Sequence, residues 1–182
     1  RADARIFALN SYENRVYQVG LEDGSSLIVK FYRPARWSDA QIREEHAFMA
    51  ELRDLEIPVG APIVRDSETI FVYEEFRFSI FERLAGRAVN LENPDDLLSM
   101  GRFVARIHAV GARARFEHRY ELSIERLGCE SRQFLLESGL LDSDLQRAYE
   151  TLSADLLKEV EARFDAHGPI RQLRLHGDCH MG

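Results

Sequence analysis

The sequence has few cysteines, no long apolar segment and no excess of positive charge. Its two cysteines, Cys129 and Cys179, lie far apart, in neither a metal-binding spacing nor a disulfide scaffold, and we expect a reducing, cytoplasmic setting. No run of about 18 apolar residues occurs, so we expect no membrane-spanning helix and no membrane partner. The net charge of −7 argues against nucleic acid as the main partner, because binding to phosphate backbones needs clustered lysines and arginines.

The common phosphate-binding and zinc-binding motifs are also missing. Neither G-x-x-x-x-G-K-[ST] nor G-x-G-x-x-G is present, and H-E-x-x-H is absent as well. A phosphate would therefore have to meet other small polar residues, such as Ser11 in the segment 9–15. From the sequence alone, an ordinary hairpin turn is the simpler explanation of that segment.

The N-terminal part has the pattern of strands with one helix among them. Alternating apolar residues, the turn signal Asp23-Gly24 and the strand-ending Pro34 delimit the strands. Ser38 and Gln41 form an S-x-x-Q capping box, which predicts the start of the helix, and apolar residues follow at helical spacing. The strands that we expect are residues 6–9, 15–21, 27–32, 69–73 and 76–84.

After Gly86 the pattern changes to helix. Asn93 is a favourable N-cap because Pro94 follows it at the first helical position. One face of this helix is expected to consist of Leu97, Gly101, Val104 and His108. We also expect helices between about residues 121 and 137 and from Asp142 or Ser143 to Gly168, and a last strand at residues 173–175. This order predicts an α+β fold with a β-rich N-lobe at 1–85 and a helical C-lobe at 86–182.

Lys30 lies within an apolar strand, on the same face as Ile28 and Tyr32. A buried ammonium group is costly unless it is paired. Glu45 lies fifteen residues later on the apolar stripe of the next helix, where a carboxylate has the same need. An ion pair would satisfy both, as in protein kinases, where a strand lysine paired with a helix glutamate holds the phosphates of ATP. The alternative is a Lys30 that reaches solvent from an edge strand, with Glu45 at the margin of the stripe.

The C-terminal segment runs from the expected strand into His176-Gly177-Asp178. Kinase-like folds present their catalytic carboxylate in such a His-x-Asp loop. Asp178 would accept the proton of an attacking hydroxyl, and His176 would support the loop by bonding to its backbone. The alternative is a metallohydrolase site formed by His176, Asp178 and His180, which has no further His-rich support in the sequence.

The segment 78–86 joins the two predicted lobes. A strand that leaves the small lobe offers free backbone N–H and C=O groups, which suit the edge of an adenine. A plain linker accounts for the same composition, and the residues alone do not decide between the two.

Together these residues resemble the aminoglycoside phosphotransferase and choline kinase superfamily, whose loop is typically HGD followed by four residues and an Asn. The resemblance rests on His176-Gly177-Asp178, Lys30, Glu45 and the segment 82–86. Three stretches, 9–17, 29–37 and 175–180, resemble still more closely a bacterial stress-response branch that phosphorylates Ser and Thr side chains of proteins.

The resemblance implies a two-lobed, protein-kinase-like fold, ATP with Mg²⁺ as cofactors, and phosphoryl transfer to proteins by a cytoplasmic monomer. It assigns roles residue by residue: an ATP-contacting turn at Ser11, the phosphates at Lys30 oriented by Glu45, the adenine at the backbone of Glu82 and Leu84, and proton acceptance at Asp178.

Two metal-binding residues of the family, an Asn and a later Asp, match nothing up to Gly182. We therefore assign no metal ligand within the chain, and expect both residues to lie beyond Gly182. We also expect an incomplete C-lobe, a missing leading segment of the N-lobe, exposed apolar faces, and no turnover by these 182 residues alone.

Three other functions remain open at this point. A small-molecule kinase acting on an aminoglycoside, choline or a homoserine-like alcohol would use the same catalytic aspartate. A pseudokinase-like module would bind ATP without transferring phosphate. A metal hydrolase, built on His176, Asp178 and His180, would require a bound metal.

Overall fold

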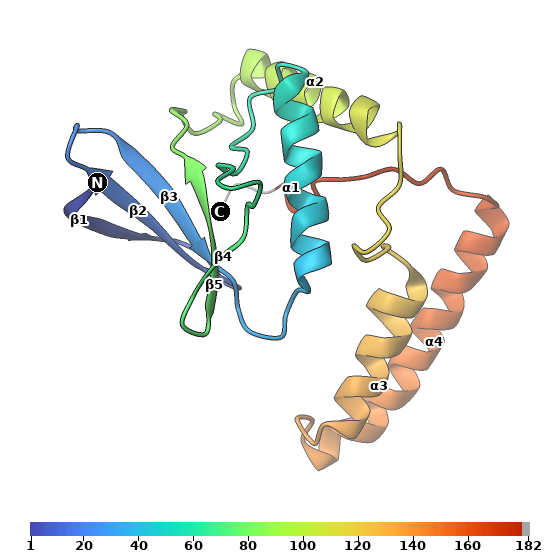
Figure 1. Cartoon of the computed structure of the whole chain (residues 1–182). Coiled ribbons are helices and arrows are strands. Elements are labelled where there is room, and N and C mark those ends of the chain that lie inside the picture. Colours follow the sequence, from blue (N-terminus) through green and yellow to red (C-terminus); the bar gives the residue numbers. More distant parts are fainter. Residues whose placement is uncertain (180–182) are drawn as a thin grey trace. The chain divides into compact units, whose positions relative to one another are not determined.

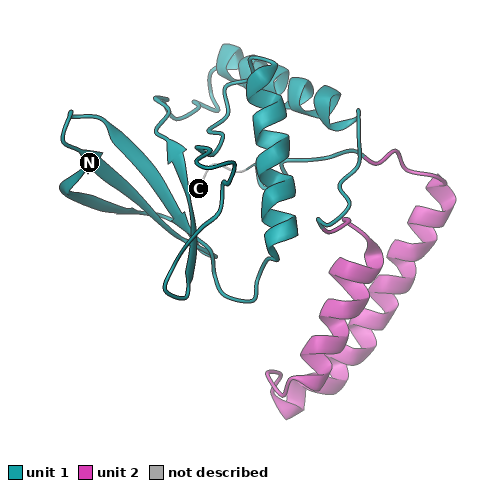
Figure 2. Cartoon of the chain, in the orientation of Figure 1, with its two compact units in different colours: residues 1–119, 173–182 teal, residues 120–172 magenta. Residues whose placement is uncertain are grey.

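The computed structural model describes residues 1–179, which form two compact units (Figure 2). Unit 1 contains Arg1–Arg119 and the C-terminal segment from Leu173, and unit 2 contains Tyr120–Gln172. A sheet together with helices confirms the predicted α+β class. Unit 1 includes residues on both sides of position 85, so the predicted boundary between the lobes stays a prediction.

Unit 1 contains a five-stranded antiparallel sheet (Figure 1). Its strands are β1 (Ala2–Leu9), β2 (Arg15–Leu21), β3 (Ser26–Phe31), β4 (Phe71–Tyr73) and β5 (Phe76–Glu82), in the spatial order β1-β2-β3-β5-β4. Lys30 on β3 pairs with Val16 of β2 on one side and with Ser79 of β5 on the other. Lys30 therefore lies on the central strand of the sheet, which excludes the alternative of an edge-strand lysine.

The strand boundaries differ from the prediction where pairing partners begin or end. β1 extends back to Ala2 because that residue pairs with Leu21 of β2. β5 ends at Glu82 rather than at residue 84 because its partner on β3 is Leu27, next to the start of that strand. A strand continues only as far as a neighbour can receive its hydrogen bonds, and the residue pattern alone does not contain that limit.

Helix α1 (Asp39–Asp54) connects the two halves of the sheet and begins at the predicted capping box. The Ser38 side chain accepts from the Gln41 N–H, and the Gln41 side chain accepts from the Ser38 N–H. The buried apolar residues of α1 belong to two clusters. One cluster consists of Ile42, Tyr32 and Ile70, and the other consists of Phe48, Leu52, Ile57 and Val110. α1 is thereby packed both on the sheet side and on the side of α2.

Helix α2 (Pro94–Gly111) begins at the predicted cap, where the Asn93 side chain accepts the N–H of Asp95 at 3.0 Å. Its predicted apolar face is largely exposed, with Leu97 45 % exposed, because nothing within residues 1–179 covers it. α2 instead buries Val110 and Gly111 at its C-terminal end. This end of the helix matters for the site because it contacts the segment before His176.

The predicted strand at residues 173–175 is wrong, because the structure has no regular secondary structure there. The N–H of Arg174 donates to the carbonyl of Gly111 at 3.2 Å, at the end of α2. An apolar alternation favours an extended backbone but supplies no neighbouring strand. This segment is held by a helix end instead of by a sheet.

Unit 2 is helical, and its elements confirm the helices predicted between 121 and 168. A π-helical turn, η1 (Glu125–Cys129), continues into α3 (Glu130–Glu137), and α4 (Ser143–His167) lies alongside α3 (Figure 1). Large apolar side chains on these helices remain exposed, namely Leu127, Phe134, Leu145, Leu152, Leu156 and Phe164. Among residues 1–179, no helix has the length and apolar character that crossing a membrane requires.

Candidate functional site

A pocket of about 360 Å³ opens beside Lys30 and Glu45 in unit 1. Nζ of Lys30 lies 3.3 Å from Oε1 of Glu45, and the two side chains are 24 % and 29 % exposed. The predicted ion pair is thus present, formed between β3 and α1 at a half-buried position. The other residues that line this pocket are Val16, Ile28, Met49, Gly60, Phe81, Glu82 and Leu84.

The walls of this pocket are mainly apolar, and strand geometry explains why. Ile28 and Lys30 are two positions apart on β3 and therefore face the same side of the sheet. Val16 joins them because it is the cross-strand partner of Lys30. Val16 was not predicted as a pocket residue, although counting back from the Asp23-Gly24 turn gives this register. A mainly apolar lining that also contains a lysine suits a flat ring that carries an anionic group.

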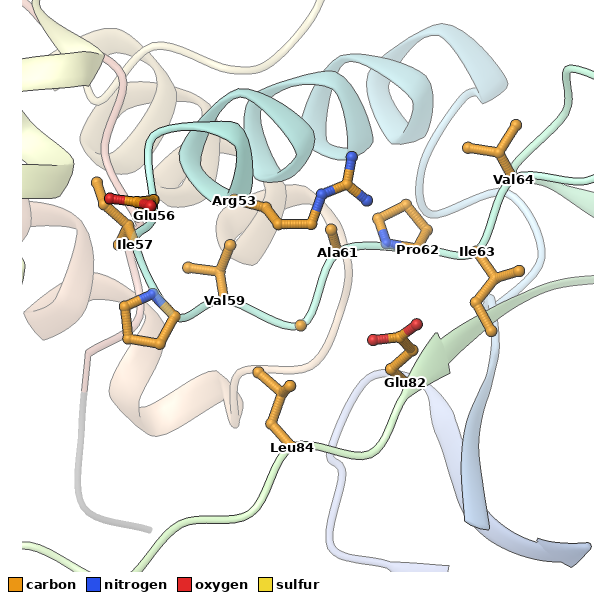
Figure 3. Close-up of a pocket in the computed structure, with 12 residues that line it drawn as sticks. Arg53, Glu56, Ile57, Val59, Ala61, Pro62, Ile63, Val64, Glu82 and Leu84 are labelled. Carbon is orange, nitrogen blue, oxygen red and sulfur yellow. The ribbon is translucent and has the colours of Figure 1, made fainter. Parts of the chain in front are cut away.

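A second pocket, of about 570 Å³, shares Gly60, Glu82 and Leu84 with the first. Figure 3 shows the side chains of Glu82 and Leu84, at and just after the end of β5, pointing toward the loop that contains Val59 and Ala61. The two residues predicted to flank an adenine therefore lie where the two pockets meet. The loop lining was not predicted from sequence, because its Pro and Gly residues gave only a turn signal.

Glu45 is shared between two cations. Its Oε2 lies 2.5 Å from Nη1 of Arg119, while its Oε1 faces Lys30. Burial acts to raise the pKa of Glu45, but the positive charges of Lys30 and Arg119 outweigh burial and hold that pKa below its ordinary value. Glu45 is therefore ionised at neutral pH. Arg119 was not predicted from the sequence, because 74 positions separate it from Glu45.

A buried hydrogen-bond network lies behind the ion pair. Nε2 of His46 is 2.9 Å from the Tyr32 hydroxyl, and Nδ1 is 2.7 Å from Oγ1 of Thr69. The Tyr32 hydroxyl donates to Ser79 Oγ, which donates to the Thr69 carbonyl. Because a carbonyl can only accept, the Ser79 proton points to Thr69 and the Tyr32 proton points to Ser79. The Tyr32 hydroxyl must then accept from His46, which places the proton of a neutral His46 on Nε2. Burial lowers the pKa of His46 to about 4.

Lys30 is also unusual in composition. Of the 24 basic residues, only Lys30 and Lys158 are lysines. Arginine forms planar, bidentate pairs, whereas lysine is a compact point charge with three rotatable donors. A lysine inside an apolar strand of so arginine-rich a chain indicates a position that needs the smaller cation.

Ser11 lies in the exposed turn between β1 and β2, and it does not line the pocket of Lys30. Its Oγ accepts the N–H of Asn14 at 3.3 Å. Glu13 of the same turn is bonded to the guanidinium of Arg36 at 2.7 Å. The turn is therefore tied to the segment between β3 and α1, and the ATP-contacting role of Ser11 stays a prediction.

The segment that leads to Asp178 is anchored through Arg174. This side chain is 9 % exposed; its Nη1 lies 2.8 Å from Oε2 of Glu51, and its Nη2 donates to the Val110 carbonyl. Its guanidinium also lies 4.4 Å from the ring centre of Phe48. The anchor therefore joins the segment to both α1 and α2.

Beyond the anchor, His176 and Asp178 are exposed. The N–H of Asp178 donates to Nδ1 of His176 at 3.3 Å, which is a backbone contact of the kind expected for a loop-supporting histidine. Of the predicted site residues, one pocket brings together Lys30, Glu45, Glu82 and Leu84. Asp178, the predicted proton acceptor, is not among the residues that line it.

The alternative metal site finds no support in the described residues. Across residues 1–179, no group of three His, Cys, Asp or Glu side chains is placed to hold a metal ion. His180, the third member of that site, lies outside the described residues.

Comparison with known sequences gives a family and named relatives. The family described as "Phosphotransferase enzyme family" matches residues 5–182. "Stress response kinase A" of Escherichia coli K12 is 37 % identical over 182 residues, which are 100 % of this chain and 55 % of the relative. "Serine/threonine protein kinase RdoA" of Salmonella typhimurium is 38 % identical over 180 residues, 99 % of this chain and 54 % of the relative. The chain thus spans about half the length of the curated relatives it matches.

Solved structures match the fold at low sequence identity. An amicoumacin kinase in complex with AMP-PNP has a TM-score of 0.66 at 21 % identity, covering 86 % of this chain and 48 % of that one. A spectinomycin phosphotransferase in complex with ADP has a TM-score of 0.64 at 14 % identity, covering 97 % and 58 %. These similarities confirm the predicted two-lobed, protein-kinase-like fold.

Proposed function

The chain belongs to the phosphotransferase enzyme family, and we propose that the protein transfers the γ-phosphoryl group of ATP to Ser or Thr hydroxyls of proteins. The observation that carries this proposal is the Lys30–Glu45 pair in the lining of a mainly apolar pocket. Such a pocket offers apolar walls to a base and a cation to phosphates. A role in a bacterial stress response is proposed from similarity to relatives of that name. A monomeric state and a cytoplasmic setting stay predictions.

In this proposal the adenine ring lies between the apolar walls of the pocket, close to Val16 and Phe81. The backbone of Glu82 and Leu84, where β5 ends, bonds to the edge of the ring. Both residues lie at the junction of the two pockets, which is the position that such contacts need. Ser11 would reach the outer phosphates from its exposed turn.

Lys30 neutralises charge on the phosphates, and Glu45 fixes the direction of its ammonium group. Glu45 is suited to this task because it is ionised and held at both carboxylate oxygens. The ammonium keeps donors for a phosphate, since a lysine has three and the pair with Glu45 uses one. The fixed geometry lowers the reorganisation needed as charge develops during transfer.

Asp178 accepts the proton of the attacking hydroxyl in the proposed reaction. An exposed carboxylate can accept a hydrogen bond from an incoming alcohol. His176 holds the loop through its bond to the N–H of Asp178. Arg174 and Gly111 fix the chain just before it.

Mg²⁺, when bound, would neutralise charge on the transferred phosphate. The described residues do not complete a ligand set for it, because no suitable group of three side chains occurs in residues 1–179. No step of the proposed phosphoryl transfer is therefore assigned to a metal ion.

The acceptor is proposed from the named relatives. At 37–38 % identity these include a protein described as a Ser/Thr protein kinase. The small-molecule kinases among the solved structures are at most 21 % identical in the cases given above, which indicates a shared fold and not a shared acceptor.

The test uses the product of the complete gene with radiolabelled γ-phosphate ATP, a casein-type protein, and a panel of aminoglycoside, choline and homoserine. We expect label on Ser and Thr of the protein. Label on an alcohol alone would replace the protein acceptor with a small molecule. Binding of ATP with no transfer to any acceptor would favour a pseudokinase, and absence of ATP binding would contradict the whole proposal.

A further inference from the structure

Arg119 makes Glu45 the centre of a cluster of three charges. One carboxylate oxygen of Glu45 faces Lys30 at 3.3 Å and the other faces Arg119 at 2.5 Å. The Arg119 side chain is 22 % exposed, about as buried as Lys30. The shorter contact is the one to Arg119, so Glu45 is held more closely by the arginine than by the lysine.

Arg119 is itself held by an aromatic ring. Its guanidinium carbon lies 4.4 Å from the centre of the Trp37 ring, a distance at which the cation and the ring face attract each other. Trp37 packs against the cluster that contains Ile42 of α1. The guanidinium thus contacts an aromatic ring as well as a carboxylate, and these two contacts fix its direction.

The backbone around Arg119 is also fixed to α1. The Glu44 carboxylate accepts the N–H groups of Glu117, His118 and Arg119, the last two at 3.0 and 2.7 Å. Nε2 of Gln41 donates to the carbonyl of His118 at 2.9 Å. Burial acts to raise the pKa of Glu44, but these backbone hydrogen bonds outweigh it and lower that pKa. Two side chains of α1 therefore hold residues 117–119 where Arg119 can reach Glu45.

The charges of the cluster do not cancel. Lys30 and Arg119 contribute two positive charges and Glu45 one negative charge, so one net positive charge remains. A simple Lys–Glu pair would be neutral. Glu82 also lines the pocket, but it is exposed and its charge is screened by water. At the half-buried cluster, where the effective dielectric is lower than in water, the local excess of positive charge favours an anionic ligand group.

We infer that Arg119 is a positioning residue. It binds one carboxylate oxygen of Glu45 and leaves the charge of Lys30 available for the phosphates of the nucleotide. This inference rests on the proposed function, since it concerns the same pocket. It adds to the proposed function that the preference of the pocket for phosphate groups depends on Arg119 as well as on Lys30 and Glu45.

The test compares ATP with adenosine, which has the same base and ribose but no phosphate. Dissociation constants for both are measured by calorimetry with wild-type protein, Arg119→Gln, Arg119→Lys and Arg43→Gln, all made from the complete gene. Arg43 is the matched control, because it also lies on the α1 side, pairs with an acid, Glu68, at 3.3 Å, and is half exposed.

We expect Arg119→Gln to weaken ATP binding about tenfold, equivalent to about 1.4 kcal/mol, and adenosine binding less than about twofold. Arg119→Lys restores the charge and should recover most of the ATP affinity, while Arg43→Gln should leave both constants unchanged. Equal losses for ATP and adenosine would show that Arg119 only maintains the pocket, and unchanged ATP binding would show that it has no role. Either result overturns the inference while the proposed function stands. If the wild-type protein does not bind ATP at all, the proposed function fails and this inference fails with it.

Discussion

The cluster around Lys30 and the segment that carries Asp178 differ in how the fold holds them. Lys30 lies on the central strand of a sheet, and its partner Glu45 is fixed by a second cation and flanked by a buried network at His46. Asp178 is exposed, its N–H donates to His176, and the segment before it is anchored through Arg174. In the proposed function, nucleotide binding and phosphoryl transfer therefore depend on separate sets of contacts, so mutations should separate them.

The largest expected effect comes from removing the proposed proton acceptor. Asp178→Ala should lower transfer by a factor on the order of 10³, because general-base contributions are of that size, while ATP still binds. Transfer of labelled phosphate and ATP affinity are measured on the same sample of the complete gene product. Asp165→Ala, an exposed acid on α4, is the control. Transfer at the wild-type rate would remove Asp178 from the role.

Replacing Lys30 should affect both ATP binding and phosphoryl transfer. Lys30→Met removes the cation beside Glu45, and we expect ATP binding and transfer each to fall by about 10-fold or more, because a charge-assisted contact to phosphate is lost. Lys158→Met changes the chain's other lysine, on α4, and should alter neither. An unchanged KM for ATP with an unchanged kcat would rule out the assignment.

The smallest effect on activity at neutral pH is expected at His46, whose role is to stabilise the fold near Lys30. Its pKa is about 4 in the folded protein, compared with about 6.5 when unfolded. The unfolded chain therefore binds the proton first. The stabilisation is complete above about pH 6.5 and is lost as the pH falls from 6.5 toward 4, by at most about 3 kcal/mol.

Urea unfolding at pH 7 and at pH 4.5 measures this loss. His46→Gln cannot titrate and should flatten the pH dependence, whereas His167→Gln, at an exposed position on α4, should keep it. The same pH dependence in wild type and His46→Gln would show that other groups cause it.

Local features of the fold were predictable from sequence because neighbouring residues create them. The capping box of Ser38 and Gln41, the Asn93 cap and the hairpin of β2 and β3 each depend on residues close together in the chain. The ion pair of Lys30 and Glu45 was also predictable, since a buried charge requires a partner and the next helix offered one.

Contacts between distant segments were not predictable in the same way. Arg119 reaches Glu45 across 74 positions, and its own surroundings contain no periodic signal. Residues 173–175 have the composition of a strand, but they bond to the end of α2 at Gly111 instead. A residue pattern gives the preference of a segment, whereas the neighbour that it meets depends on the packing of the whole unit.

The most direct test of separate support for binding and transfer is Gly111→Ala compared with Gly101→Ala. A Cβ at Gly111 would overlap the carbonyl of Arg174, whereas one at Gly101, on the same helix, would have no neighbour within 4 Å among residues 1–179. ATP affinity and transfer rate are measured on both variants, with thermal unfolding as a check of folding. We predict that Gly111→Ala lowers transfer at least about tenfold, as misplacement of a catalytic group does, while ATP affinity stays within about twofold. Gly101→Ala should leave both unchanged. A parallel fall in ATP affinity and transfer rate, or no fall in transfer rate, would contradict separate support for binding and transfer.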